Sequence, residues 1–308
     1  MTDATNSTAN STAKPATPNQ LGIVSPGITF GAYLANPGYG SSDLAAFKQG
    51  PPAMVPWRRA NQGHSAATIL GSAAHCRILE PGTFEREFYV KEPDEAFRTK
   101  EAKAKRDEMK VAGTQILSHT DGLIVEGIVA AFHGNPTASK SMAGAVNVEA
   151  SMFWTCPVSG LPRRCRPDWH DKTAVYDLKV VREAMGSLER LKRAAYWNGW
   201  MHQLAGNRAG IRAATSIDVQ VGRLVCIAPK PPHGIRVWLL EVGANDLDLL
   251  ELENENICRE MAPHHVSGDW PGAPHEWLPC PVPASTFYID GAEEVDEADP
   301  EEEDSNDV

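Results

Sequence analysis

The sequence predicts an α/β fold, with a central mixed β-sheet and helices on both of its sides. Long stretches without helix-breaking residues indicate helices, and short runs of alternating or β-branched residues between them indicate strands. The chain has 308 residues, of which 42% are hydrophobic, enough to bury one large core. The other elements are arranged around two neighbouring strands near the middle of the chain.

Helices dominate the first half of the prediction. Residues 27–40 are punctuated by glycine and proline and are expected to be irregular. Ser41 or Ser42 is expected to cap the first helix, which Gly50 and two prolines end. Helices are predicted over 41–49, 65–79, 98–110 and 121–132, followed by a strand over 147–154. The lysine-rich helix at 98–110 presents either a solvated face or a basic ridge facing DNA.

The middle of the chain is predicted to form a β-hairpin or two neighbouring strands. One run ends at Asp168, and a second run, rich in β-branched residues, covers 174–181 after a short polar linker. Successive side chains of a strand point to opposite faces, so Asp177 and Lys179 share a face and Leu178 points away. If the strands pair, Asp168 lies across from that face, and two carboxylates converge with one lysine.

The second half is predicted to contain one long helix, two strands and a final helix. The long helix covers 182–210 and carries a stripe of side chains formed by Tyr196, Trp200, Gln203 and Asn207. The strands are expected at 216–227 and 234–242, and the amphipathic helix at 246–261. The histidines at 264, 265 and 275 lack partners at metal-ligand spacing and are interpreted as structural.

Two carboxylates beside a lysine suit metal-assisted hydrolysis of a phosphodiester. Carboxylate oxygens hold Mg²⁺ while leaving positions for water and a phosphate oxygen, and a lysine stabilises negative charge or orients the water. An Asp-x-Lys on a strand is also common at a solvated edge. Glu149 is either a solvent-facing residue or a third carboxylate, and Gln203 either reaches the site or caps a strand. His75, taken alone, is an ordinary core or surface histidine.

The charge and the cysteine content of the sequence limit the classes of protein to which it can belong. The net charge is −11, and the eleven acidic residues between 290 and 307 account for all of it, so the rest is neutral. We predict a disordered leader at 1–27 and a disordered acidic tail at 288–308. No apolar run approaches the length of a membrane span. The six cysteines are too scattered for a zinc ribbon or an iron–sulfur cluster, and reduced thiols in a cytoplasmic protein are expected.

Several motifs together resemble the exonuclease VIII (RecE-type) family of phage recombination exonucleases, within the PD-(D/E)XK nuclease superfamily. The resemblance runs in order from about Tyr33 to Trp277. Its blocks are the helix Gly71–Pro81, which fits G-x-A-x-H-x-x-x-L-E-P, then Glu149 on a strand, Cys165-Arg166-Pro167-Asp168, Asp177-Leu178-Lys179, and Tyr196 through Gln203. It implies a restriction-endonuclease-like core within a single domain at 28–287.

The resemblance implies an enzyme that degrades one strand of linear duplex DNA, in the 5′-to-3′ direction, for annealing-type recombination. His75, Glu149, Asp168 and Asp177 correspond to metal-binding positions for Mg²⁺, which Mn²⁺ can replace. Lys179 corresponds to the catalytic lysine, and Gln203 to a supporting polar residue in the catalytic set with Asp168 and Asp177. The implied partners are DNA ends, a RecT-type single-strand annealing protein and further copies of the chain in a homo-oligomer, in the cytoplasm of a bacterial host cell.

Two departures and two alternatives accompany this resemblance. The family's aromatic residue four positions after the glutamine is Asn207 here, and its threonine after the lysine is Val180. The same site would serve a structure-specific or endo-acting PD-(D/E)XK repair nuclease. A non-catalytic DNA-binding module of the same fold is the other alternative. Arg163, Arg164, Arg166 and Lys172 flank Asp168 and are expected to grip the DNA backbone or to be solvated.

Overall fold

The computed structural model describes residues 23–25, 27–61, 66–181, 187–229 and 235–273. The predicted acidic tail lies outside these residues, as do 1–22 and 26 of the predicted leader and His275. The end of the predicted leader is a strand: β1 (Ile23–Ser25) pairs antiparallel with β5 (Ser151–Thr155). The leader boundary at residue 27 was therefore placed too late. None of the described helices is long and apolar enough to cross a membrane.

The described strands form three sheets. The largest is mixed and has the order β10-β9-β8-β7-β4, with only the β8–β9 pair parallel. Its strands are β4 (Asn147–Val148), β7 (Trp169–His170), β8 (Ala174–Val180), β9 (Val221–Ala228) and β10 (Arg236–Val242). The second sheet is antiparallel, in the order β1-β5-β6, with β6 at Pro162–Cys165. A small parallel pair joins β2 (Phe88–Val90) to β3 (Gln115–Leu117).

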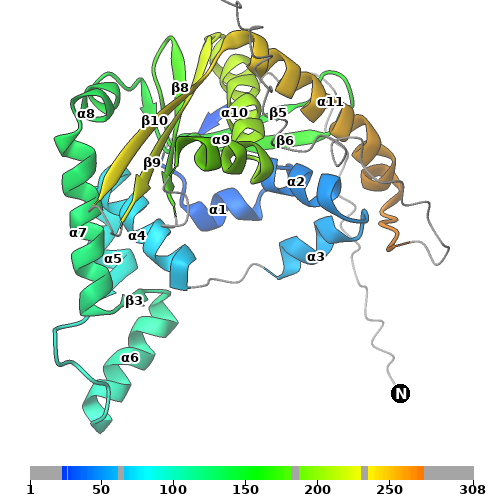
Figure 1. Ribbon diagram of the computed structural model, residues 1–308. Helices are drawn as coiled ribbons and strands as arrows, with labels where there is room; N and C mark the ends of the chain where they lie inside the picture. The colour runs from blue at the N-terminus through cyan, green and yellow to red at the C-terminus, as the bar shows by residue number, and fades with distance from the viewer. Residues whose placement is uncertain (1–22, 26, 62–65, 182–186, 230–234, 274–308) are drawn as a thin grey trace, which may run out of the picture. The chain divides into compact units, whose positions relative to one another are not determined.

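Helices cover both faces of the large sheet, as predicted (Figure 1). In the N-terminal half they are α1 (Phe30–Ala35), α2 (Ser41–Gln49), α3 (Met54–Ala60), α4 (Ala66–Leu79), α5 (Phe84–Glu87), α6 (Lys100–Ala112), α7 (His119–Gly134) and α8 (Pro136–Ala143), with a 3-10 turn at Pro81–Thr83. In the C-terminal half they are α9 (Leu188–Trp197), α10 (Trp200–Thr215) and α11 (Ala244–Ser267).

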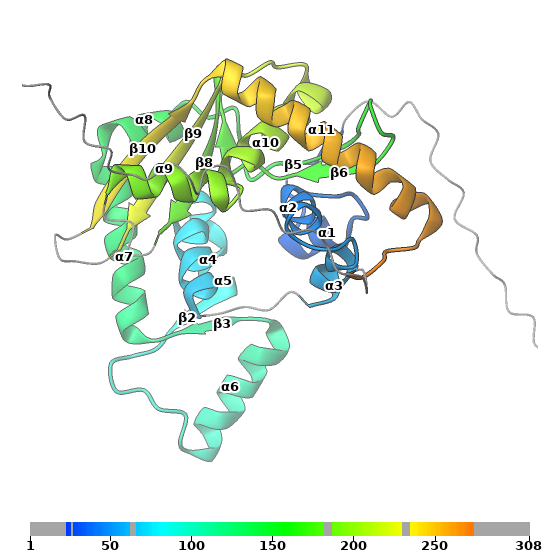
Figure 2. The ribbon, with the colours of Figure 1, turned by 45° about the vertical axis from the view of Figure 1, so that its right-hand side comes forward.

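The alternation of side chains along β8 divides the core into two layers. Tyr176 and Leu178 pack against α4 and α7, in a cluster that includes Phe132 and the fully buried Trp169. Val175 lies on the opposite face, in a cluster with side chains of α9, α10 and α11. Figure 2 shows these three helices beside the large sheet. Asp177 and Lys179 share the face of Val175, because side chains two apart on a strand point the same way. The sheet therefore presents both polar side chains towards α10.

The predicted hairpin forms, with shifted boundaries. Trp169 and His170, assigned to a polar linker, are strand β7 and pair with Tyr176 and Val175. The preceding run at 162–165 pairs with β5 in the other sheet instead. The linker prediction was wrong because Trp169 buries its ring against Tyr176, with the ring centroids 5.0 Å apart and the planes nearly parallel.

Two elements that the sequence predicted as continuous are divided. The long helix at 182–210 is α9 and α10, because Gly199 has the left-handed φ of +73° that ends helices. The strand at 147–154 is β4 and β5, because Glu149 has a φ of +50°. A left-handed residue does not continue a helix or a strand, and periodicity alone does not reveal it.

The start of the described chain also differs from the prediction. Residues 30–35, expected to be irregular, form α1, which Thr29 caps through its side chain. The cap of α2 is Gly40 rather than a serine, because the Asp43 carboxylate accepts a hydrogen bond from the Gly40 N–H at 2.9 Å. Asp43 is buried and also binds Arg59 at 2.9 Å, so this polar cluster fixes α2 beside α3.

Candidate active site

The site forms where the chain crosses between the two larger sheets. One crossing runs from β4 to β5 through Glu149, and the other runs from β6 to β7 through Asp168. The two crossings are joined, since the Glu149 N–H donates to the Asp168 carbonyl at 2.9 Å. The left-handed backbone of Glu149 is a strained conformation of the kind that clusters at functional sites. Both carboxylates therefore project from irregular backbone at one edge of the large sheet.

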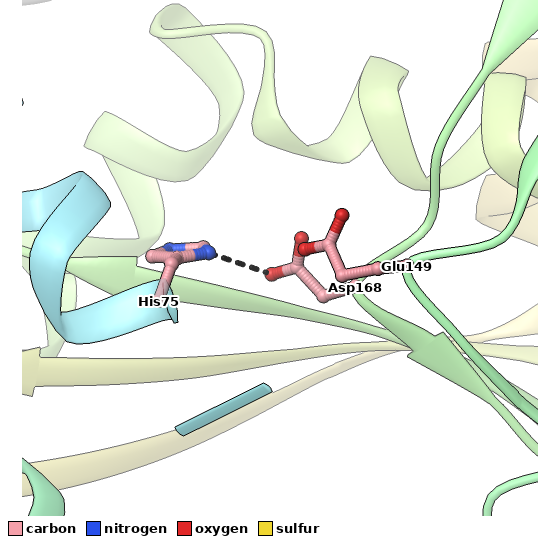
Figure 3. A group of neighbouring side chains, drawn as sticks. All are labelled: His75, Glu149 and Asp168. Atoms are coloured by element: carbon pink, nitrogen blue, oxygen red, sulfur yellow. Dashed lines mark ion pairs between the residues drawn. The ribbon is translucent and has the colours of Figure 1, made fainter. Parts of the chain in front are cut away.

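His75, Glu149 and Asp168 form a group that can hold a metal ion (Figure 3). One ligand atom of each lies within 4.8 Å of the others. His75 comes from α4, and its Nδ1 lies 3.6 Å from Asp168 Oδ2. Oxygen ligands with one imidazole fit a hard or borderline divalent cation. Helix α4 thus delivers the histidine to the carboxylates of the two crossings.

Neighbouring groups hold both carboxylates in place. The Leu178 N–H donates to Asp168 Oδ2 at 2.5 Å, which locks Asp168 onto strand β8. Arg166 Nε donates to Glu149 Oε2 at 2.5 Å, and the same guanidinium lies 3.4 Å from Glu80. This anchoring of the ligands by hydrogen bonds is typical of metal centres.

The arginines before Asp168 are held by the protein itself and are not the solvated side chains of the alternative prediction. Arg163 and Arg164 are only 5% and 4% exposed. Arg163 donates to the Tyr39 carbonyl, and Arg164 donates to three carbonyls of the segment around α1. Arg166 is held by Glu149 as described, so these side chains fasten the N-terminal segments to the site. Arg164 and Arg166 also line a cavity beside Lys179.

Burial shifts the proton affinities of the metal-ligand group. Burial and the nearby Asp168 raise the pKa of Glu149 to about 7. The pKa of Asp168 is likewise raised, by burial first and then by Asp177. Burial and Lys179 lower the pKa of His75, which keeps its imidazole neutral and able to bind a cation at pH 7. A divalent cation would relieve the repulsion between the buried carboxylates, so the donor set fits a metal.

The stability of the metal-free protein is expected to depend on Glu149. Its pKa is higher folded than unfolded, so its contribution is favourable below about pH 4.5 and is lost as pH rises to about 7. Compared with Glu149→Gln, the wild-type protein should lose roughly 2–3 kcal/mol between pH 4.5 and 8 in EDTA. Urea unfolding of both proteins across this range measures the difference.

Added Mg²⁺ is expected to reverse this loss, because metal binding requires the ionised carboxylate. The stabilisation by Mg²⁺ should therefore be larger at pH 8 than at pH 6, and Glu149→Gln should weaken it. A pH-independent difference between the two proteins would contradict the assignment of Glu149 to the buried cluster.

A second polar chain lies beside the first. Lys179 Nζ is 2.6 Å from Asp177 Oδ2 and donates to Gln203 Oε1 at 3.0 Å. Gln203 Nε2 donates to Asp177 Oδ1 at 2.8 Å, which closes a ring of three side chains. Burial acts to lower the pKa of Lys179, but Asp177 and Asp168 outweigh it and raise that pKa, so the lysine is charged. Gln203 reaches the site rather than capping a strand.

The two groups are adjacent but distinct. Asp177 is fully buried and faces Lys179 and Gln203, while the group of possible ligands within 4.8 Å is His75, Glu149 and Asp168. Strand β8 links them, because it carries Asp177 and Lys179 and also donates its Leu178 N–H to Asp168. The sequence motif thus becomes a metal-ligand group next to a lysine held by a carboxylate and an amide.

A cavity of about 290 Å³ opens beside the lysine, and we call it the lysine cavity. Arg58, Arg166, Lys179, Trp200 and Gln203 are among its lining residues. Its charged lining residues, among those the structure describes, are all cationic. Asn207 lines it too, and its buried Nδ2 has no hydrogen-bond partner among the described residues.

Sequence reasoning missed two contributors to this site. Arg58 was not among the predicted site residues, yet it lines the cavity together with Lys179, which lies more than a hundred residues later in the chain. Glu80, in the Leu-Glu-Pro block, was not assigned, yet it lies 3.4 Å from Arg166. Tyr196 was placed on one stripe with Gln203, but the break at Gly199 puts it on α9 instead.

The comparisons with known proteins bear on the fold. No family model matches the chain, and no curated protein matches it. Among solved structures, it is similar to a crystal structure of a "putative exonuclease" from Eubacterium rectale, with a TM-score of 0.54 and 14% sequence identity. The similarity covers 85% of this chain and 98% of the other. Together with the mixed sheet flanked by helices, it shows that the chain shares an α/β fold with that structure, which is consistent with the predicted PD-(D/E)XK-like core.

Proposed function

We propose that this protein is a metal-dependent exonuclease that degrades linear duplex DNA. The observation that carries the proposal is the position of the His75–Glu149–Asp168 group directly beside the Lys179–Asp177–Gln203 ring. The first offers ligands to a divalent cation, and the second offers a charged donor next to a cationic cavity. Metal-assisted phosphodiester hydrolysis can use both features, and the fold shared with the "putative exonuclease" supports the same class of reaction.

Each residue of the site has a separate role in the proposed reaction. His75, Glu149 and Asp168 would hold Mg²⁺, or Mn²⁺ in its place, and the cation would supply Lewis-acid stabilisation of the phosphate charge. Lys179 is charged, so it donates hydrogen bonds to the attacking water or to a phosphate oxygen and does not act as a base. Gln203 and Asp177 fix its ammonium group.

The reaction we propose is in-line hydrolysis. The water oxygen forms a bond to phosphorus and gives up a proton to solvent, while the bond from phosphorus to the 3′-oxygen breaks and that oxygen takes up a proton from solvent, which leaves a 5′-phosphate and a 3′-hydroxyl. Asp168 of the metal-ligand group accepts a hydrogen bond from the Leu178 N–H, directly next to Lys179 on β8, so one phosphate can contact both the metal-ligand group and Lys179. We further propose 5′-to-3′ degradation, a bacterial cytoplasmic setting, a homo-oligomer and a RecT-type annealing partner, on the motif resemblance alone.

The proposal is tested by incubating end-labelled linear duplex with the full chain, in Mg²⁺ and in EDTA. We expect progressive release of nucleotides in Mg²⁺ or Mn²⁺ and none in EDTA. The rate should fall steeply with salt, because the contacts go to phosphates. Binding without cleavage in any divalent cation would favour the non-catalytic DNA-binding module instead.

A further inference from the structure

A second cavity adjoins the lysine cavity across the break between α9 and α10. It has a volume of about 270 Å³ and is lined by Lys48, Tyr196, Trp197 and His202, among others. The two cavities share Ser41, Ala45 and Gly199 as lining residues, so they are neighbours on one surface. We call this second cavity the aromatic cavity.

The break at Gly199 distributes the aromatic side chains between the two cavities. Trp197 ends α9 and lines the aromatic cavity, while Trp200 begins α10 and lines the lysine cavity. Trp197 is 73% exposed and Tyr196 is 41% exposed, with their ring centroids 5.5 Å apart. Large aromatic side chains left exposed beside a cavity are available to stack on a flat ligand.

Charge differs between the cavities. Four cationic side chains line the lysine cavity: Arg58, Arg164, Arg166 and Lys179. Acidic side chains pair with Arg166 and Lys179, but among the described residues no carboxylate pairs with Arg58, so the cavity keeps a positive charge. Beside the aromatic cavity, Glu253 pairs with Lys48 and lies 3.4 Å from His202, so the charge of Lys48 is compensated. A phosphate is therefore favoured in the lysine cavity, and a neutral aromatic group is favoured in the other.

We propose that the aromatic cavity binds an unpaired nucleobase of the DNA strand whose phosphate lies in the lysine cavity. A nucleotide carries a charged phosphate and a flat neutral base joined by one sugar, which matches the difference in charge between two adjacent cavities. The volume is near the lower end of the roughly 300–1,000 Å³ typical of ligand pockets, which suits one base. Stacking on Trp197 would hold it without reading sequence, with Tyr196 beside the stack because the two ring planes lie at 79° to each other. This inference rests on the proposed nuclease function.

Binding in EDTA tests the inference without any need for cleavage. The probe is linear duplex carrying 2-aminopurine, a fluorescent base that stacking quenches, at each of the terminal positions in turn. The wild-type protein should quench one or two adjacent positions. Trp197→Ala should abolish that quenching and weaken binding about tenfold. The control is Trp57→Ala, since Trp57 is 58% exposed but lines neither cavity, and it should behave as the wild type.

Cleavage in Mg²⁺ then separates this inference from the proposed function. A substrate with an abasic site at the quenched position should raise the KM of the wild-type protein about tenfold. The KM of Trp197→Ala should be the same for the abasic and the intact substrate, because the base site is already lost in that variant. Quenching in EDTA with no cleavage in Mg²⁺ would overturn the nuclease proposal alone. The opposite outcome is cleavage in Mg²⁺ by both proteins, with the same quenching and the same KM in the wild type and in Trp197→Ala. That result would overturn the aromatic base site alone.

Discussion

Replacement of Lys179 by alanine is expected to reduce metal-dependent DNA cleavage about a thousandfold or more. Its ammonium is held by Asp177 beside the metal-ligand group and lines the lysine cavity. Removing such a donor from a preorganised site typically lowers the rate by two to four orders of magnitude. Initial rates on end-labelled linear duplex in Mg²⁺ measure the loss.

Loss of activity in Lys179→Ala must be distinguished from loss of stability. The substitution leaves the fully buried Asp177 carboxylate without its cation, at a cost of about 3–5 kcal/mol. Adding Asp177→Asn removes that charge and should restore most of the stability without restoring cleavage. Lys192→Ala, which removes a surface ion pair with Glu189, is the matched control and should keep full activity. Near-normal cleavage by folded Lys179→Ala would refute the role of the lysine.

Asp168→Asn is expected to abolish cleavage and yet to stabilise the metal-free protein. Asp168 is 7% exposed, and burial and Asp177 raise its pKa, so its ionised form opposes folding at neutral pH and above. Asparagine keeps an oxygen that can accept from the Leu178 N–H but carries no charge. The melting temperature in EDTA at pH 8 should therefore rise, while stabilisation by Mg²⁺ should disappear.

His75→Ala provides the companion test of the same metal-ligand group. It should weaken stabilisation by Mg²⁺ and lower activity strongly, with a small change in the metal-free melting temperature, because the His75 side chain is 28% exposed. The control is His133→Ala, an exposed histidine at the end of α7. If Asp168→Asn lowered the melting temperature and kept full stabilisation by Mg²⁺, the metal-ligand group would be wrong.

The sequence predicted the parts of the fold that depend on periodicity. Strand β8, helix α4 and the sharing of one face by Asp177 and Lys179 follow from alternation and from helical stretches of small residues. The α/β architecture with helices on both faces of a mixed sheet was predicted for the same reason. These features depend on residues that are close together in the sequence, so the pattern of hydrophobic and polar residues within each segment predicts them.

The parts that the sequence did not predict depend on single backbone angles and on distant contacts. The left-handed residues Glu149 and Gly199 divide a strand and a helix, and the hydrophobic pattern of the sequence shows neither break. The buried roles of Arg163 and Arg164 arise from carbonyls near Tyr33 and Tyr39, more than a hundred residues earlier. In the sequence, a cluster of arginines such as this one is typical of a DNA-binding surface.

The most direct test of the account is a side-by-side incubation of linear, nicked and covalently closed duplexes of one sequence with the full chain in Mg²⁺. An exonuclease that grips ends through phosphates should digest the linear duplex whatever its sequence and leave the closed circle intact. Lys179→Ala should leave all three substrates intact. Cutting of the closed circle at the rate of the linear duplex would contradict the account and show that the site belongs to an endonuclease.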